Sequence, residues 1–251
     1  MLTDQRKQFI LDRLQREGQV VAKTLAQELA LSEDTIRRDL RELAQAGLLQ
    51  RVHGGALPAS PAIADFPQRQ QIATAAKEAI GYAAAQLIQP GQVVILDGGT
   101  TAVQIARQLP PTLRATIVTH SPSVAVELAQ HPTVEVILIG GRLFKHSVVA
   151  VGAAAIEALS HINADLYFMG VTGIHPQAGL TTGDLEEAYV KRALCDRAAE
   201  TVVLASSEKL GVASAYVIAP VSKVSGLIVG KEVDEAIVKP YLALGLTITR
   251  A

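Results

Sequence analysis

The residues best suited by type and spacing to bind a ligand are Asp97, Gly98, Gly99, Thr100 and Thr101, which follow a run of four aliphatic residues. A glycine-rich turn between a strand and a helix leaves backbone N–H groups free. The two threonine hydroxyls add donors, so the turn can receive an anion such as phosphate. It matches neither the P-loop nor the G-x-G-x-x-G pattern and therefore does not imply a nucleotide. Glycines in such turns often serve backbone geometry alone, so a purely structural role is also open.

Polar residues and glycines also follow other predicted strands further along the chain. In an open parallel sheet such strand ends border one crevice, where ligands bind. Lys209 would supply positive charge for a phosphate, and Glu186 could accept hydrogen bonds from sugar hydroxyls. The predicted ligand-binding residues are Asp97, Gly98, Gly99, Thr100, Thr101, Thr119, His120, Ser121, Gly141, Gly173, Glu186, Lys191 and Lys209.

A second group of chemically active residues consists of arginines on a predicted helix over residues 32–46. Ile36, Leu40 and Leu43 recur at helical spacing and face a core, so the arginines project elsewhere. The Ser32 hydroxyl can cap the first turn of this helix.

Two further helices are predicted before this one, over residues 3–17 and 22–30, and a short hairpin with a Gly-Gly turn follows it. This order predicts a winged helix-turn-helix, with the third helix in the major groove of DNA and the wing along the adjacent backbone. The predicted DNA-binding residues are Ser32, Thr35, Arg37, Arg38, Arg41, Arg51, His53 and Gly54.

An ordinary solvated helix is the alternative interpretation of the arginine segment. Glu33–Arg37 and Arg38–Glu42 are i, i+4 pairs, which stabilise an exposed helix by roughly 0.2–0.5 kcal/mol each. Spacing alone leaves both interpretations open.

The larger part of the chain has the pattern of an α/β domain. After a predicted helix over residues 72–88, continuous Val/Ile/Leu runs alternate with helical stretches, which is typical of parallel strands buried on both faces. The runs lie at 93–96, 116–118, 134–139, 166–169, 202–204 and 227–229. We therefore predict a DNA-binding domain over 1–57, a Pro-containing linker over 58–71, and an effector domain over 72–251 that is expected also to oligomerise.

Composition sets the outer limits on function. The 251 residues carry 23 Lys and Arg against 24 Asp and Glu, a balance that by itself argues against a nucleic-acid binder. Residues 1–57 hold nine of the basic and eight of the acidic residues, so positive charge is concentrated rather than abundant. One cysteine favours a reducing compartment. Without a signal-peptide pattern or an uncharged apolar run of about 18 residues, a cytoplasmic protein is expected.

The chain resembles the DeoR family of bacterial transcriptional regulators. The string Ser32-x-x-Thr35-Ile-Arg-Arg-Asp-Leu40, followed by Arg51-x-His-Gly-Gly-Ala56, closely matches the family's helix-turn-helix and wing. The second half matches through D-x-G-T-T at residues 97–101, G-x-x-G-I at 170–174, and S-S-x-K at 206–209. The resemblance extends from about Gln5 to Thr249.

The resemblance implies a DNA-binding regulator, most often a repressor, that forms a dimer or tetramer on operator DNA. It also implies an effector domain similar to ribose-phosphate isomerases, with a phosphorylated sugar or related metabolite as ligand and no other cofactor. Three positions depart from the family pattern: Ala22 replaces a hydroxyl residue, His120 replaces Asn, and Gly230-Lys231 replaces Thr-Asp. His120 could change which hydroxyls or charges the ligand carries.

Two other functions remain open from the residues. A sugar-phosphate isomerase with an added DNA-binding domain would use Asp97, Glu186 and Lys209 as an acid/base set, although we expect no enzymatic activity. An architectural DNA-binding protein would bind no ligand. No metal is expected, because His131, His146, His161 and His175 lack metal-ligand spacing. Cys195 has no recognisable base partner, so we expect a packed thiol and not a nucleophile.

Overall fold

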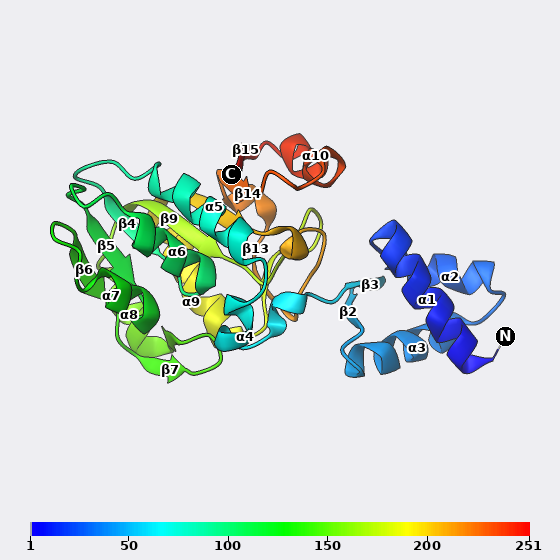
Figure 1. Cartoon of the computed structure of the whole chain (residues 1–251). Helices are drawn as coiled ribbons and strands as arrows, with labels where there is room; N and C mark the ends of the chain where they lie inside the picture. Colours follow the sequence, from blue (N-terminus) through cyan, green and yellow to red (C-terminus); the bar gives the residue numbers. More distant parts are fainter. Residues whose placement is uncertain (1) are drawn as a thin grey trace.

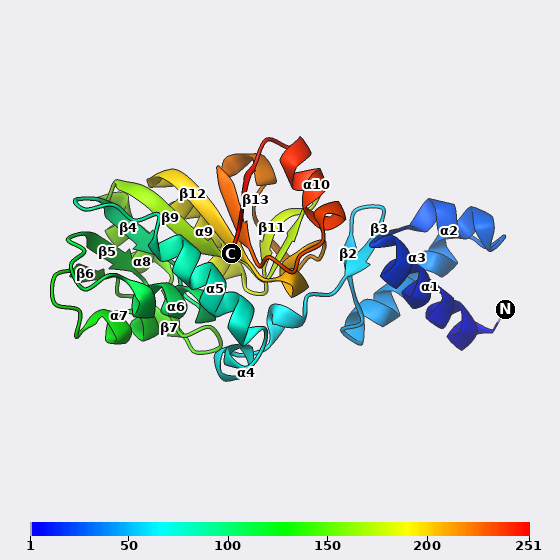
Figure 2. The same ribbon diagram turned by 45° about the horizontal axis from the view of Figure 1, so that its top comes forward.

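The computed structural model describes residues 2–251 and contains two domains joined by a short connection (Figure 1, Figure 2). The smaller domain consists of α1 (Thr3–Glu17), β1 (Val20–Val21), α2 (Ala22–Glu28), α3 (Glu33–Gln45), β2 (Leu49–Val52) and β3 (Gly55–Pro58). Its core includes Ile10, Leu25, Ile36 and Leu40, each at most 2% exposed. The three predicted helices and the hairpin are confirmed, and together they form a winged helix-turn-helix.

Strand β1 was not predicted, and it makes the wing a three-stranded sheet in the order β1-β3-β2. Val20 pairs with Ala56, and Val21 pairs with Gly55. A Cβ atom on Gly55 would lie 1.9 Å from the Val20 carbonyl oxygen, so this position requires glycine. The second glycine of the predicted turn therefore allows β1 to approach β3.

The predicted linker contains two short helices, η1 (Pro61–Ile63) and α4 (Phe66–Gln70). Ser60 accepts a hydrogen bond from Ala62 N at 3.1 Å, and Asp65 accepts one from Gln68 N at 3.0 Å, so each helix has a side-chain cap. Phe66 is buried in the core of the larger domain. Residues 58–71 therefore contain regular secondary structure, whereas their proline content predicted a linker without it.

The larger domain is built on a seven-stranded sheet in the order β15-β14-β12-β9-β4-β5-β6. All neighbouring strands of this sheet are parallel. The strands are β4 (Val93–Leu96), β5 (Thr116–Thr119), β6 (Glu135–Leu138), β9 (Ala164–Gly170), β12 (Ala198–Ala205), β14 (Gly226–Val229) and β15 (Thr247–Arg250). The six predicted strands are present, and β15 is an additional one.

Helices cover both faces of this sheet, as the apolar runs predicted. One core contains side chains of α5 (Thr74–Ala85), α6 (Thr100–Gln108) and α7 (Pro122–Leu128). The other contains side chains of α8 (Ala153–Ser160), α9 (Leu185–Asp196) and α10 (Glu235–Ala243). Strand β6 differs from its prediction as a strand buried on both faces: it lies at the sheet edge, where Leu138 is 51% exposed.

Smaller elements lie around the central sheet. Strands β10 (Gly173–His175), β11 (Gly179–Thr182) and β13 (Tyr216–Ala219) form an antiparallel sheet, and β7 (Arg142–Phe144) pairs with β8 (Val149–Val151). Two short helices, η2 (Ser207–Lys209) and η3 (Val221–Lys223), follow β12 and β13. Among residues 2–251, no helix has the length and apolar character needed to cross a membrane.

Candidate functional site

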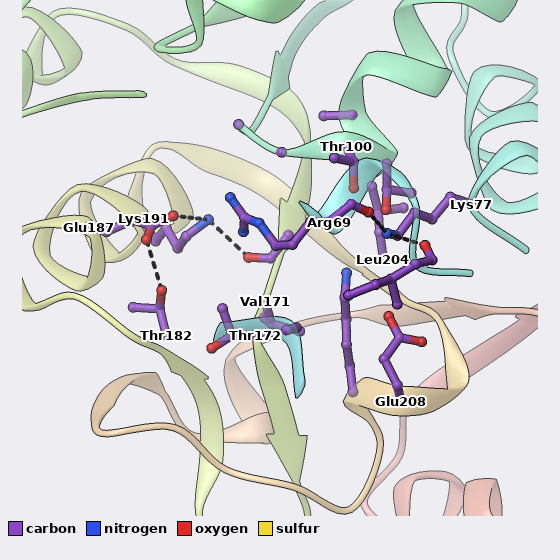
Figure 3. Close-up of a pocket in the computed structure, with 18 residues that line it drawn as sticks. Arg69, Lys77, Thr100, Val171, Thr172, Thr182, Glu187, Lys191, Leu204 and Glu208 are labelled. Atoms are coloured by element: carbon purple, nitrogen blue, oxygen red, sulfur yellow. Dashed lines mark hydrogen bonds and ion pairs between the residues drawn. The ribbon is translucent and has the colours of Figure 1, made fainter. Parts of the chain in front are cut away.

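A cavity opens at the carboxyl ends of β4, β9 and β12, the three central strands of the large sheet (Figure 3). This is where ligands bind in open parallel sheets. The strand ends contribute residues 98–102, residues 170–172, Leu204, Glu208 and Lys209. The rest of the lining consists of Ala62, Arg69, Ile72, Lys77, Thr182, Glu187 and Lys191.

Three basic side chains without a paired carboxylate line this cavity. Lys209 is 8% exposed, and burial lowers its pKa to about 8. Within the described residues its ammonium group has no hydrogen bond or ion pair. Two guanidinium nitrogens of Arg69, Nε and Nη2, are buried without a hydrogen-bond partner, and burial lowers the pKa of this residue as well. Lys77 Nζ donates to the carbonyl oxygens of Arg69 and Ile72, at 2.5 Å each.

The N-terminus of α6 faces the same space. Gly99, with φ of +113°, begins the helix, which has no side-chain cap there. The first backbone N–H groups of an α-helix have no partner within the helix and carry partial positive charge. Since Thr100 and Thr101 add hydroxyls, this end of the cavity combines cations and donors in a way that suits an anion.

A network of buried charges lies beneath the cavity floor, centred on Asp97. Its carboxylate contacts Lys191 Nζ and accepts hydrogen bonds from the backbone N–H groups of Gly98 and Gly170, at 2.7 Å each. Burial alone would raise the pKa of Asp97, but Lys191 and His120 hold it well below its usual range. Asp97 is therefore an ionised residue that positions its neighbours.

His120 completes this network from the adjacent strand. Its Nε2 lies 2.8 Å from Asp97 Oδ1, and its Nδ1 lies 2.9 Å from the carbonyl oxygen of Ala150. Both ring nitrogens lie within hydrogen-bond distance of these oxygens, so the ring connects Asp97 to β8. His120 is fully buried and does not line the cavity, so it acts on Asp97 and not directly on a ligand.

The opposite wall of the cavity carries carboxylate and hydroxyl groups. Glu187 Oε2 accepts hydrogen bonds from Thr182 Oγ1 at 3.0 Å and from Ser147 Oγ at 3.3 Å. Glu187 Oε1 lies 3.6 Å from Lys191 Nζ. A second hollow continues past Arg69 and Glu187 and is lined also by Phe144, His146, Ser147, Gly183 and Asp184.

The structure distributes the predicted ligand residues over three places. Six line the cavity: Gly98, Gly99, Thr100, Thr101, Lys191 and Lys209. Four are buried behind it: Asp97, Thr119, His120 and Ser121. The remaining three do not line it: Gly141 packs against β8, Gly173 packs close to Val212 and Ala213, and Glu186 lies one residue before the carboxylate that faces the cavity.

The placement of Glu186 is thus corrected to Glu187. On a helix, positions four apart share a face, and Lys191 follows Glu187 by four positions, so that spacing would have identified the right residue. Arg69 and Lys77 were also missed. Arg69 lies in the segment predicted as a linker, and Lys77 has the ordinary appearance of a charged residue on an amphipathic helix.

The helix-turn-helix domain presents the predicted basic residues on its surface. Arg37, Arg38, Arg41, Arg51, His53 and Gly54 are all exposed. Ser32 accepts a hydrogen bond from Thr35 N at 3.2 Å, so it caps α3 as expected, and its hydroxyl also contacts the Thr35 hydroxyl.

Ion pairs divide the arginines of α3 into two kinds. Arg37 pairs with Glu33 at 2.7 Å, as the solvated-helix interpretation predicted. The predicted pair between Arg38 and Glu42 does not form, because Glu42 pairs with Lys7 of α1 at 2.7 Å. Among residues 2–251, Arg38, Arg41 and Arg51 have no carboxylate within ion-pair distance, which leaves their charge available to a partner.

Family models match both domains. Residues 6–61 match the DeoR-like helix-turn-helix domain, and residues 72–231 match the DeoR C terminal sensor domain. The chain belongs to the DeoR family. It is a DNA-binding transcriptional regulator, and most of the residues that line the cavity described above belong to the sensor domain.

Curated relatives extend over most of this DeoR-family chain. The HTH-type transcriptional regulator GlpR of Haloferax volcanii is 36% identical, over 84% of this chain and 83% of the relative. The HTH-type transcriptional regulator GolR of Listeria innocua is 32% identical, over 99% of this chain and 98% of the relative. The glycerol-3-phosphate regulon repressor of Escherichia coli is 31% identical, over 84% of each chain.

Solved structures give a more distant likeness. Ribose 5-phosphate isomerase A of Methanocaldococcus jannaschii is 18% identical over 53% of this chain and 52% of its own, with a TM-score of 0.39.

Proposed function

We propose that this regulator is a repressor that releases its operator when a phosphorylated sugar binds in the sensor-domain cavity. The observation that carries the proposal is Lys209, a buried ammonium group without a hydrogen bond or ion pair among the described residues, in a cavity bordered by the N-terminus of α6. A buried charge without a partner is costly. A bound phosphate would pair with Lys209 and accept hydrogen bonds from residues 99–101.

The carboxylate wall supports a polyhydroxylated ligand. Glu187 and Thr182 offer acceptors and donors on the side of the cavity across from Lys77 and Glu208 (Figure 3), and Ser147 and Asp184 line the adjoining hollow. Sugar hydroxyls both donate and accept hydrogen bonds, so they fit such a mixed surface. A phosphorylated sugar would therefore lie with its anion at α6 and its hydroxyls toward α9.

Control of DNA binding requires that the effector prefer the released state. A ligand shifts a conformational equilibrium only by the difference between its affinities for the two states. A single winged helix makes a small interface with DNA, so we infer that a dimer or tetramer binds a repeated operator sequence.

The geometry favours binding over isomerisation. Acid–base catalysis needs a group within hydrogen-bond reach of the substrate, whereas Asp97 is fully buried and neither Asp97 nor Glu186 lines the cavity. Turnover of a pentose phosphate by the purified protein would reinstate the isomerase interpretation.

Fluorescence anisotropy on the DNA upstream of the chain's own coding sequence tests the proposal. We expect the full chain to bind this DNA, and one member of a panel of phosphorylated sugars to weaken that binding. Lys209→Met and Thr101→Ala should bind DNA normally but lose the response, whereas Lys239→Met, on the exposed surface of α10, should keep it. Retention of the full response by Lys209→Met would refute the proposed anion site.

A further inference from the structure

The connection between the two domains passes through the wall of the proposed effector cavity. It leaves the wing at the end of β3, and within the following residues Ala62 and Arg69 both line the cavity. Residues 62–71 lie outside both ranges matched by the family models. This segment is therefore physically part of the sensor site, although it precedes the sensor domain in sequence.

Several hydrogen bonds hold the segment against the sensor domain. The Ser60 hydroxyl donates to the carbonyl oxygen of Thr172, a cavity residue. The backbone N–H of Ala213 donates to the carbonyl oxygen of Pro58 at 3.4 Å, next to the bridge between Ala59 and Ala213. Pro58 is also the last residue of β3, so the wing strand and the sensor domain hold the same short stretch of chain.

The far end of the segment is fixed less completely. Lys77 Nζ donates to the carbonyl oxygens of Arg69 and Ile72, which ties the end of α4 to α5. The Arg69 guanidinium extends across the cavity toward Lys191 and Glu187 (Figure 3). Its Nε and Nη2 are nevertheless buried without partners. Buried donors without partners are rare, and an anionic oxygen in the cavity would satisfy both.

We propose that the interdomain segment 58–71 is a working part of the effector site: Arg69 binds an anionic oxygen of the ligand, and the Ser60–Thr172 contact passes the resulting shift to the wing. The inference rests on the proposed function, since it needs an anionic ligand in this cavity. It adds a binding residue from outside the sensor domain and a covalent route to the DNA-binding surface. A movement of α4 toward a ligand would act on β3, because only residues 59–65 separate them.

Hydrogen–deuterium exchange with inorganic phosphate tests the first half of the proposal. The full chain is compared in phosphate and in chloride at equal ionic strength. We expect peptides covering residues 97–103 and 66–77 to become protected together. Arg69→Gln should remove the protection at 66–77, whereas Arg114→Gln, on the exposed surface of the sensor domain, should leave it unchanged. If phosphate protects the wild-type peptides over 97–103 but not those over 66–77, the role of Arg69 is overturned. If phosphate protects neither region, the anion site itself is refuted.

A coupling measurement tests the second half. Operator affinity is measured with and without the most effective sugar phosphate, for the wild type and for Ser60→Ala. We expect the wild-type change in operator affinity to lie within the roughly 5–150-fold range of allosteric systems. In Ser60→Ala it should fall below about twofold, with effector and operator affinities otherwise retained. Ser123→Ala on α7 serves as the control.

A second variant distinguishes loss of the interdomain route from a local effect of removing the Ser60 hydroxyl. Insertion of two glycines between Ala59 and Ser60 lengthens the connection without altering any cavity residue. It should also abolish coupling while each ligand still binds. Full coupling in both variants would overturn the proposed route, whereas loss of coupling in both, with circular dichroism unchanged, would support it.

Discussion

Single residues in the sensor domain show how buried charged groups are paired with one another. The carboxylates of Asp97 and Glu187 lie against the Lys191 ammonium group, and Asp97 also lies against the His120 ring. Each member has hydrogen-bond partners within the group, on the backbone or on neighbouring hydroxyls. Replacement of one member would leave the others uncompensated in a low-dielectric interior.

Asp97→Asn should therefore destabilise the protein by roughly 3–5 kcal/mol at pH 7, the usual cost of breaking a buried ion pair. The folded pKa of Asp97 lies below its unfolded value, so its contribution is complete above about pH 4 and is lost as the pH falls further. Urea unfolding at several pH values measures both effects. Asp196→Asn, which breaks an exposed pair with Lys223, should cost about 1 kcal/mol or less. Equal costs for the two variants would contradict the assigned network.

Lys209 should make effector affinity depend on pH. Its pKa is about 8 in the free protein because of burial, and pairing with a phosphate would raise that pKa in the complex. The complex then holds more protons than the free protein, so affinity falls as the pH rises through 8. Calorimetric titration between pH 7 and about 9.5 would measure this decline. Lys209→Arg should give a nearly flat profile, and a flat wild-type profile would exclude Lys209 from the phosphate site.

Residue types and strand ends were enough to predict six of the eighteen residues that line the candidate cavity. Residues 98–101 and Lys209 follow buried strands, and this position is visible in the sequence as the end of an apolar run. Arg69 could not be found in this way, because its role depends on α4 folding back over the strand ends. His120 and Asp97 were placed in the right region, but only the packing shows that they lie behind the cavity wall.

At the scale of elements, α3 presents two neighbouring arginines in different electrostatic states. Arg37 is engaged by Glu33, whereas Glu42 is engaged by Lys7 and so leaves Arg38 without a carboxylate. The third helix of such a domain enters the major groove. Arg38 can bind DNA without first breaking an ion pair, whereas Arg37 cannot.

Arg38→Ala should weaken operator binding by about 1–3 kcal/mol if the residue contacts a base, with a smaller loss for Arg37→Ala. A phosphate contact would instead reduce the slope of log affinity against log salt by about one. Anisotropy titrations at several salt concentrations separate these cases. Arg114→Ala in the sensor domain should bind like the wild type. An unchanged midpoint and slope for Arg38→Ala would remove that residue from the DNA surface.

Long helices and strands with a clear hydrophobic period could be predicted from the sequence, whereas short elements without such a period could not. The helices over residues 3–17 and 33–45 follow a clear 3.6-residue repeat, and the interior strands are continuous apolar runs. The elements α4 and β15 were missed because the former has five residues and the latter alternates Thr, Ile, Thr and Arg without an apolar run. Whether an apolar strand is interior or at an edge depends on strand order, which explains the error at β6.

At the scale of the whole molecule, each of the two domains has its own distribution of charged residues and its own hydrophobic core. The near-neutral total hides exposed arginines on the helix-turn-helix domain and buried, compensated charges in the sensor domain. The helix-turn-helix domain has its own hydrophobic core, whereas two other cores lie on either side of the large sheet. Each domain therefore has the means to unfold as a separate unit.

Differential scanning calorimetry of the full chain should show two transitions that respond differently to ligands. An effector at 100 times its dissociation constant stabilises the sensor domain by about 2.7 kcal/mol, which corresponds to roughly 5–10 °C for a domain of this size. Operator DNA should instead raise the transition of the helix-turn-helix domain. Lys209→Met should abolish the effector shift and keep the DNA shift. If effector moved both transitions equally, the two domains would form one cooperative unit, and the interdomain segment would be a rigid connection instead of a relay.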